Sequence, residues 1–141
     1  MTDAVTGARL AAAALTLVGT PFRLHGREPG VGLDCVGVIE AAFARSGRAV
    51  RLANGYPLRT RIVPSVRLDL ERLGLEPVGD TLLPGDVLML RPSTCQLHLA
   101  IVICGTSVVH AHAGLRRVVH GALPPDWPLL HHWRLAPNPR N

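Results

Sequence analysis

The sequence has few aromatic residues and few cysteines. Aromatic residues make up only 4% of the 141 residues, so the core must consist mainly of aliphatic side chains, which the hydrophobic content of 48% supplies. Cys35, Cys95 and Cys104 are an odd number of cysteines, which argues against a disulfide framework. The longest apolar run near the N-terminus, 10–18, is far shorter than the roughly 20 residues of a membrane-spanning helix. We expect a single domain over 1–141, with 137–141 as a frayed tail and no transmembrane segment.

Basic residues are in excess but do not form a block. The formal net charge is +5 at pH 7, which indicates a basic surface or attraction to an acidic envelope polymer. Because aromatic residues that could stack on bases are few, we expect no specific nucleic-acid partner. The run 10–18 has no basic segment before it, so we expect synthesis in the cytoplasm without a signal peptide.

The order of helical and strand-like patterns predicts an α+β fold. Apolar residues recur at helical spacing first, and strand-like segments follow after Leu83-Pro84-Gly85. Asp34 has the side chain of a helix N-cap, and Ser46-Gly47 ends the helix that it begins. The expected helices are 6–18, 35–45 and 66–73, and the expected strands are 86–91, 97–104, 107–113, 117–123 and 130–135. This order favours an antiparallel sheet packed against the helix that begins at Cys35.

Cys35 is the candidate nucleophile among the cysteines. It follows the predicted N-cap directly, where free backbone N–H groups and the helix dipole lower the pKa of a thiol. The same N–H groups can face the oxyanion of a tetrahedral intermediate. The alternative is a buried cysteine with no chemical role. Cys104 is expected to pack at the end of an apolar strand, and Cys95 lies in a loop.

Three histidines lie on neighbouring predicted strands. His98 interrupts an apolar strand, and His110 and His112 alternate on the next one and so share a face. A nucleophilic thiol needs an imidazole within hydrogen-bond reach and a third group that orients it. His131 and His132, near the C-terminus, are expected at the surface.

Several segments together resemble the NlpC/p60 family of bacterial cell-wall peptidases. They occur in the family's order and extend over roughly residues 10–136. They are Gly19-Thr20-Pro21-Phe22-Arg23, Gly32-Leu33-Asp34-Cys35-Val36-Gly37-Val38-Ile39, Leu83-Pro84-Gly85-Asp86-Val87-Leu88, His98-Leu99-Ala100-Ile101-Val102 and Val108-Val109-His110-Ala111. The resemblance implies a papain-like α+β fold and a cysteine peptidase that cuts peptide bonds of peptidoglycan, without a metal or other cofactor.

The resemblance also implies the roles of the site residues. Cys35 is then the nucleophile, His98 the general base and later acid, and His110 the residue that orients His98. A hairpin turn centred on Gly105-Thr106 would instead place His98 opposite residue 113, which makes His112 the closer neighbour. Sheet twist or a bulge can reconcile the two, so His112 is kept as an alternative third residue.

The predicted cleft departs from the family pattern at two positions. Phe22, Asp34 and Val36 are its candidate wall residues. The family usually has Tyr at the position of Phe22 and commonly Ser at that of Val36, so a module that has lost catalysis and binds a hub protein or the wall is the alternative. A zinc site made of Cys95 and the three strand histidines is a further alternative, although it lacks the usual knuckle.

The C-terminal third is similar to the phage-encoded branch of the family, which includes tail-associated peptidases of phages and gene-transfer particles. The residues that carry this resemblance are Val118-Val119, Leu123, Pro125, Trp127 and Trp133-Arg134-Leu135. It implies a virion component that is bound to hub or tip proteins of a phage-like tail and acts in the periplasm and cell wall.

Overall fold

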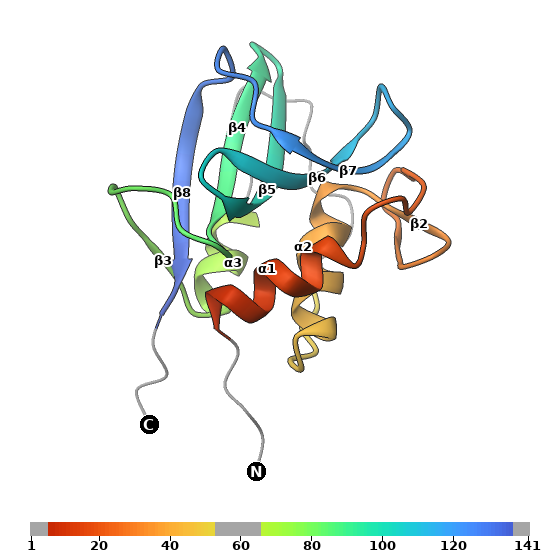
Figure 1. Ribbon diagram of the computed structural model, residues 1–141, viewed down its shortest axis with the longest axis horizontal. Coiled ribbons are helices and arrows are strands. Elements are labelled where there is room, and N and C mark those ends of the chain that lie inside the picture. Colours follow the sequence, from red (N-terminus) through yellow and green to blue (C-terminus); the bar gives the residue numbers. More distant parts are fainter. Residues whose placement is uncertain (1–5, 53–65, 137–141) are drawn as a thin grey trace.

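Three helices pack against a six-stranded antiparallel sheet (Figure 1). The computed structural model describes residues 6–52 and 66–136. The helices are α1 (Gly7–Leu15), α2 (Cys35–Arg45) and α3 (Val66–Arg72). The strands are β1 (Arg27–Glu28), β2 (Gly32–Leu33), β3 (Leu75–Pro77), β4 (Val87–Ser93), β5 (Gln96–Cys104), β6 (Ser107–His112), β7 (Arg117–Ala122) and β8 (Leu129–Leu135). The predicted α+β class is confirmed, and no helix in these ranges is long and apolar enough to cross a membrane.

The strand order in the main sheet is β3-β8-β4-β5-β6-β7. The five predicted strands correspond to β4 to β8, with boundaries shifted by one or two residues. The prediction missed β3, which pairs only with β8, and the short hairpin of β1 and β2 in a segment that was expected to be a loop. These elements are too short for a periodic pattern, so only their pairing partners define them.

The α2 helix begins where the Asp34 side chain caps it. The Asp34 carboxylate accepts a hydrogen bond from the Gly37 N–H at 2.8 Å and a second one from the His25 N–H at 2.9 Å. The residues of α2 from Cys35 to Phe43 are apolar except Glu40, and those from Cys35 to Ile39 are all buried. Capping fixes the start of the helix, and burial of its apolar residues against the sheet stabilises it.

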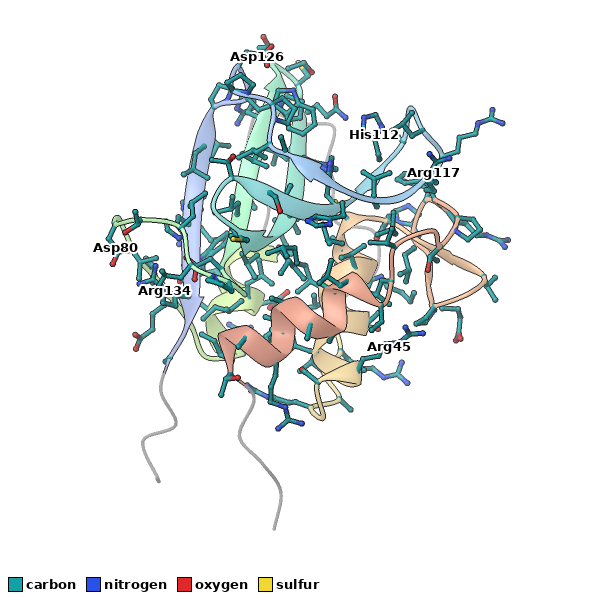
Figure 2. The ribbon with its side chains drawn as sticks, in the orientation of Figure 1. Arg45, Asp80, His112, Arg117, Asp126 and Arg134 are labelled. Carbon is teal, nitrogen blue, oxygen red and sulfur yellow. The ribbon has the colours of Figure 1, made fainter. Side chains whose placement is uncertain are left out.

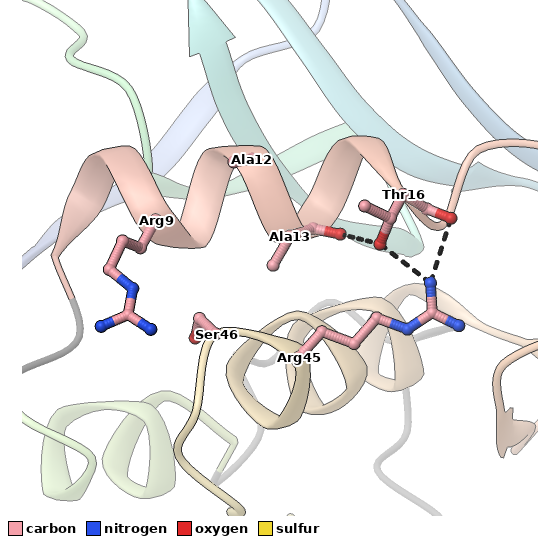
Figure 3. A pocket seen from close by; sticks show the side chains of 6 residues that line it. All are labelled: Arg9, Ala12, Ala13, Thr16, Arg45 and Ser46. Carbon is pink, nitrogen blue, oxygen red and sulfur yellow. Dashed lines mark hydrogen bonds between the residues drawn. The ribbon is translucent and has the colours of Figure 1, made fainter. Parts of the chain in front are cut away.

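Arg45 links the ends of the first two helices (Figure 3). Its guanidinium donates to the Thr16 carbonyl at 3.1 Å and to the Thr16 hydroxyl at 2.8 Å. A cation at this position satisfies carbonyls at the C-terminal end of α1 that have no partner within the helix. Arg45 thus lines the hollow between the two helices as part of a structural contact, and the Ser46 hydroxyl in the same hollow donates to the Phe43 carbonyl at 2.9 Å.

The sheet is buried on both faces. On β5, Leu97, Leu99 and Ile101 point into the main core with the helices, whereas Ala100 and Val102 belong to a second apolar cluster. That cluster also contains Leu88, Leu90 and Val108, and the partly buried Leu82, Leu123 and Trp127 pack against it. By the alternation of side chains along a strand, His98 lies on the face of this second cluster.

A buried ionic network holds the loop before β4 against β8. The Asp86 carboxylate, 1% exposed, accepts from His132 Nε2 at 2.6 Å, from Arg134 Nε at 3.0 Å and from the Leu83 N–H at 2.9 Å. Arg134 also binds the exposed Asp80 at 2.7 Å (Figure 2). The expectation that His132 lies at the surface is therefore wrong, because it is the buried partner of a carboxylate far away in the sequence.

Candidate active site

Cys35 is the first residue of α2 and is only 4% exposed. The N–H groups of Cys35 itself, Val36 and Leu99 lie near the thiol and favour its anionic form. Leu99 directly follows His98 on β5, so the thiol lies against the strand that carries the candidate base.

Burial has the largest effect on the acidity of the Cys35 thiol. It raises the thiol pKa from 9.0 to about 12, and the negative charge of Asp34 acts in the same direction. The nearby backbone N–H groups lower the pKa by less. The predicted lowering of the thiol pKa is therefore wrong for this closed site, because desolvation outweighs the helix N-terminus. At neutral pH the thiol is protonated, and it needs a base when it attacks.

His98 and His110 form a direct hydrogen bond. His98 Nε2 and His110 Nδ1 are 2.6 Å apart, and the ring planes are nearly perpendicular at 85°. If the His98 Nε2–H donates, His98 Nδ1 is left unprotonated and can accept a proton. Both side chains are buried, and the hydrogen bond between them holds the orientation of the His98 ring.

A bulge in the β5–β6 hairpin decides which residues lie opposite one another. Cys104 pairs with Ser107, but after a register shift Ile101 pairs with Val109. Continued along the strands, this register places His98 opposite residue 112 and makes His110 its diagonal neighbour on the same face. A diagonal pair is within reach of long side chains, and the hydrogen bond from His98 goes to His110.

His112 has a different partner. Its Nδ1 accepts a hydrogen bond from the Leu115 N–H at 3.1 Å, across the turn between β6 and β7. The ring of His112 is tilted by 52° against that of His110, with 5.7 Å between the centroids. His112 therefore shapes the hairpin turn and lies next to the imidazole pair, outside the hydrogen bond to His98.

Both imidazoles of the pair are neutral at pH 7. Burial, followed by the charges of His110 and His112, lowers the pKa of His98 from 6.5 to about 3. Burial, followed by the charge of His112, lowers the pKa of His110 from 6.5 to about 4. His98 is thus present in the form that accepts a proton.

These lowered pKa values predict that the fold loses stability in acid. Below 6.5, the ordinary histidine pKa, the unfolded chain binds protons that the folded chain does not. The stability is complete above that pH and falls as the pH drops toward 3–4, by up to about 1.4 kcal/mol per pH unit for each histidine. Urea unfolding between pH 7 and pH 4.5 measures this slope. His98→Gln should have a smaller slope, and the exposed His120→Gln should keep that of the wild type; equal slopes in all three proteins would contradict the prediction.

Cys35, His98 and His110 line one cavity of about 480 Å³, within the usual range for ligand sites. Phe22 and Asp34 are also in its wall. Val36 is not: it is 1% exposed and packs in the main core, because the residue after Cys35 points to the interior side of α2. Val36 as a cleft residue is therefore a wrong prediction. The cavity is lined by Phe22, Leu24, Asp34, Cys35, Pro92, Gln96, Leu97, His98, His110, Ala111, His112, Ala113, Gly114 and Trp127.

Trp127 is a wall residue that the sequence prediction of the site missed. Its ring centroid lies 5.4 Å from that of His98 and 6.0 Å from that of His110, edge-on to both. It shields the imidazole pair from water on the side of the second apolar cluster. The sequence feature that could have indicated Trp127 is a tryptophan between prolines in a chain that is poor in aromatic residues.

The cavity wall does not contain the ligand set of the alternative zinc site. Cys95 is exposed in the turn between β4 and β5 and is not among the lining residues. Within residues 6–52 and 66–136, no group of three or more His, Cys, Asp or Glu side chains is arranged to hold a metal ion. Both oxygens of Asp34 accept hydrogen bonds from backbone N–H groups, those of His25 and Gly37.

The fold is similar to solved NlpC/p60 structures. NlpC1 from Trichomonas vaginalis has a TM-score of 0.69 and 20% identity, over 96% of this chain and 46% of that one. The NlpC/p60 domain of the peptidoglycan hydrolase SagA has a TM-score of 0.61 and 25% identity, over 89% of this chain and 99% of that domain. An NlpC/p60 family protein from Bacillus cereus has a TM-score of 0.68 and 19% identity, over 97% of this chain and 42% of that one.

These similarities confirm the predicted papain-like fold of the NlpC type. The chain spans about half the length of the two Trichomonas proteins, 46% and 48%. Comparison of the sequence with protein-family models and with curated proteins finds no match. The likeness is thus one of three-dimensional structure, and the chemistry of the site has to be argued from its own residues.

Proposed function

We propose that this protein is a cysteine peptidase that hydrolyses peptide bonds of bacterial peptidoglycan. The observation that carries the proposal is the meeting of Cys35, at the start of a capped helix, with the hydrogen-bonded His98–His110 pair in one cavity. A thiol, a neutral imidazole and a group that orients the imidazole are the parts that acyl transfer by cysteine needs. The NlpC/p60 domain of SagA, a peptidoglycan hydrolase, supports the choice of substrate.

The geometry supports a two-step reaction. His98 Nδ1 takes the proton of the Cys35 thiol as the sulfur attacks the amide carbonyl, and the N–H groups at the start of α2 bind the oxyanion. The imidazolium then gives this proton to the leaving amine, and a thioester remains. Water, deprotonated by His98, hydrolyses the thioester and restores the thiol. His110 accepts the Nε2–H of His98 throughout and keeps the ring in place.

Digestion of purified peptidoglycan tests the proposal. The wild-type protein should release soluble peptide fragments and generate one new amino group and one new carboxyl group for each bond cut. Mass spectrometry of the fragments identifies the bond, and the Cys35→Ala variant provides the matched blank. Release of sugar fragments with intact peptides would contradict the assignment.

A second candidate is a module of the same fold that binds the wall or a hub protein without catalysis. Two observations favour it: the thiol is buried with a raised pKa, and Phe22 offers no hydroxyl group to the cavity. This module would bind peptidoglycan in a pull-down assay but leave its peptides intact. The digestion described above therefore separates the two candidates.

The identity of the third catalytic residue gives a quantitative prediction. His110→Ala should lower kcat/KM by about 10- to 100-fold, because it removes the hydrogen bond that orients His98. His112→Ala should lower it less, since His112 Nδ1 binds the Leu115 N–H instead. Steady-state kinetics on a released wall peptide, with circular dichroism as a folding control, measures both values. A larger loss for His112→Ala would show that His112 orients the base.

We further propose that the protein is carried in a phage-like tail, bound to hub or tip proteins, and acts in the periplasm. The support is the similarity of the β7–β8 segment to tail-associated peptidases, at Leu123, Pro125, Trp127 and Trp133-Arg134-Leu135. Mass spectrometry of intact particles purified from producing cells is the test. Absence of the chain from particles, with free enzyme in the periplasm, would contradict this role.

A further inference from the structure

The three most exposed large apolar side chains among the described residues lie in two neighbouring loops. Leu24 is 67% exposed and Val31 is 59% exposed, both in the segment 23–33 that contains β1 and β2, and Leu115 is 52% exposed in the turn between β6 and β7. Figure 1 shows these two loops at the same edge of the molecule. The other large apolar side chains that are exposed are 40–48% exposed and are scattered over the rest of the described chain. A concentration of such residues at one edge indicates contact with something outside the chain.

Backbone hydrogen bonds join the two loops into one unit. The Phe22 N–H donates to the Arg116 carbonyl at 2.8 Å, which connects the first loop to the β6–β7 turn. Within the first loop, the Leu33 N–H donates to the Pro21 carbonyl at 3.0 Å, and the Arg23 N–H donates to the Leu33 carbonyl at 3.2 Å. The exposed apolar side chains of both loops are therefore held in fixed positions relative to one another.

Backbone strain occurs next to two of the three apolar residues. His25 directly follows Leu24, Arg116 directly follows Leu115, and both His25 and Arg116 have a φ of 60°. They are the two non-glycine residues with positive φ in the part of the chain that the structure describes. This region of φ favours glycine, and strain of this kind is concentrated at functional segments. The His25 conformation is stabilised by the hydrogen bond from its N–H to the Asp34 carboxylate at 2.9 Å.

Three arginines accompany the apolar side chains. Arg23, Arg116 and Arg117 are exposed, and none of them forms an ion pair or a side-chain hydrogen bond with the described residues. The only acidic residue in the segments 21–33 and 113–117 is Glu28. This edge of the molecule therefore combines exposed apolar side chains with an excess of positive charge.

We propose that this edge docks the protein on the surface of an anionic lipid bilayer. Leu24, Val31 and Leu115 enter the interfacial layer, and the guanidinium groups of the arginines bind the lipid phosphates. Apolar side chains flanked by arginines are typical of segments that lie in a membrane interface, and an arginine stem can stay in the apolar layer while its head group reaches the phosphates. A bilayer accepts apolar side chains that are separated by cations, whereas a stable protein interface needs a closely packed apolar centre.

The inference adds a place of action to the proposed function and does not depend on it. Leu24 lines the Cys35 cavity, and Gly114, which also lines it, directly precedes Leu115. A docked molecule therefore has this wall of the cavity next to the bilayer.

Flotation of the full chain with lipid vesicles tests the role of the arginines. We expect binding to vesicles of phosphatidylcholine with phosphatidylglycerol, weaker binding in high salt, and little binding to phosphatidylcholine alone. Arg116→Gln with Arg117→Gln should weaken binding to the anionic vesicles by about 10- to 30-fold. The matched control is Arg72→Gln, which removes an exposed arginine on α3 and should bind like the wild type.

A second pair of variants tests whether the apolar side chains enter the bilayer. Val31→Ser with Leu115→Ser should weaken binding to the anionic vesicles by about 10- to 100-fold, whereas Leu68→Ser, at a position that is 45% exposed on α3, should not. In Leu115→Trp, the emission of the new tryptophan should shift to shorter wavelength on binding, and brominated lipid should quench it. Leu68→Trp should show neither effect. Thermal unfolding of each variant checks that it is folded, and the Leu115→Trp reading does not depend on a variant that loses binding.

Each remaining outcome overturns part of the proposal. Absence of binding to anionic vesicles, or equal binding by the wild type and both double variants, overturns docking on a bilayer. Binding that needs the arginines, without quenching of Leu115→Trp, overturns insertion and leaves only attraction to a charged surface. Release from vesicles by soluble polyglutamate at a lower concentration than by added anionic lipid assigns the edge to an acidic protein partner and overturns the lipid. Vesicle binding by a protein that cuts no wall peptide supports docking and contradicts the peptidase, and the reverse result contradicts docking alone.

Discussion

Cys35→Ser is expected to lower the hydrolysis of wall peptides by at least about 10³-fold. A serine hydroxyl is much harder to deprotonate than a thiol and is the weaker nucleophile, and the partner of His98 is the neutral His110 imidazole, not a carboxylate. The fold should persist, because serine is close to cysteine in size and its hydroxyl can accept a hydrogen bond from the backbone N–H of Leu99, which lies near the thiol. Initial rates of amino-group release, with thermal unfolding as a control, measure both effects.

The other two cysteines provide matched controls for this substitution. Cys95 and Cys104 are exposed and lie outside the cavity. Cys95→Ser and Cys104→Ser should each retain the wild-type rate within about twofold, since surface substitutions usually change little. Turnover at the wild-type rate in Cys35→Ser would show that another group attacks the substrate.

His98→Ala is expected to lower kcat/KM by about 10²- to 10⁴-fold, the contribution that a positioned general base typically makes. The effect should exceed that of any change at His110, because His98 transfers the proton and His110 only orients it. The truncation leaves a space beside Cys35, so added imidazole should restore part of the activity. The rate in increasing imidazole, compared with that of the wild type, measures the rescue.

His120 is the control for His98. It is exposed on β7 and its Nε2 lies 2.7 Å from the Ser107 hydroxyl, away from the cavity. His120→Ala should retain its activity and should not respond to imidazole. If His98→Ala keeps more than a tenth of the wild-type rate, the thiol uses a different base.

The sequence was sufficient to predict the elements whose signal is local. The cap of α2 is visible in Asp34, and the β-branched runs define β5 and β6, so the fold class and the strand that bears His98 followed directly. The contact between the His98 and His110 side chains was harder to predict from the sequence. It depends on the bulge between Val102 and Cys104, and a register shift of one residue has no marker in the sequence.

Burial caused the other errors. His132 was expected at the surface near the end of the chain, but it is buried against Asp86. Asp86 directly precedes β4, and the pairing of β4 with β8 brings it to His132. Cys104 was expected to pack and is exposed, because β5 continues past the covered part of the sheet. Helix-terminus arguments also cannot anticipate how deeply Cys35 is desolvated, and this depth determines the direction of its pKa shift.

The position of β8 in the sheet bears on the order in which the protein folds as it is made. Although β8 follows all the other strands of the described residues in sequence, it lies between β3 and β4 and pairs with both. A ribosome that has released residues up to β7 has therefore produced a hairpin sheet whose β4 edge is unpaired, and an open edge invites pairing with other chains. The nascent chain is exposed to this risk until residue 135 has left the exit tunnel. Arg134 and His132 then bind Asp86, and β8 joins β3 to the β4 edge of the sheet.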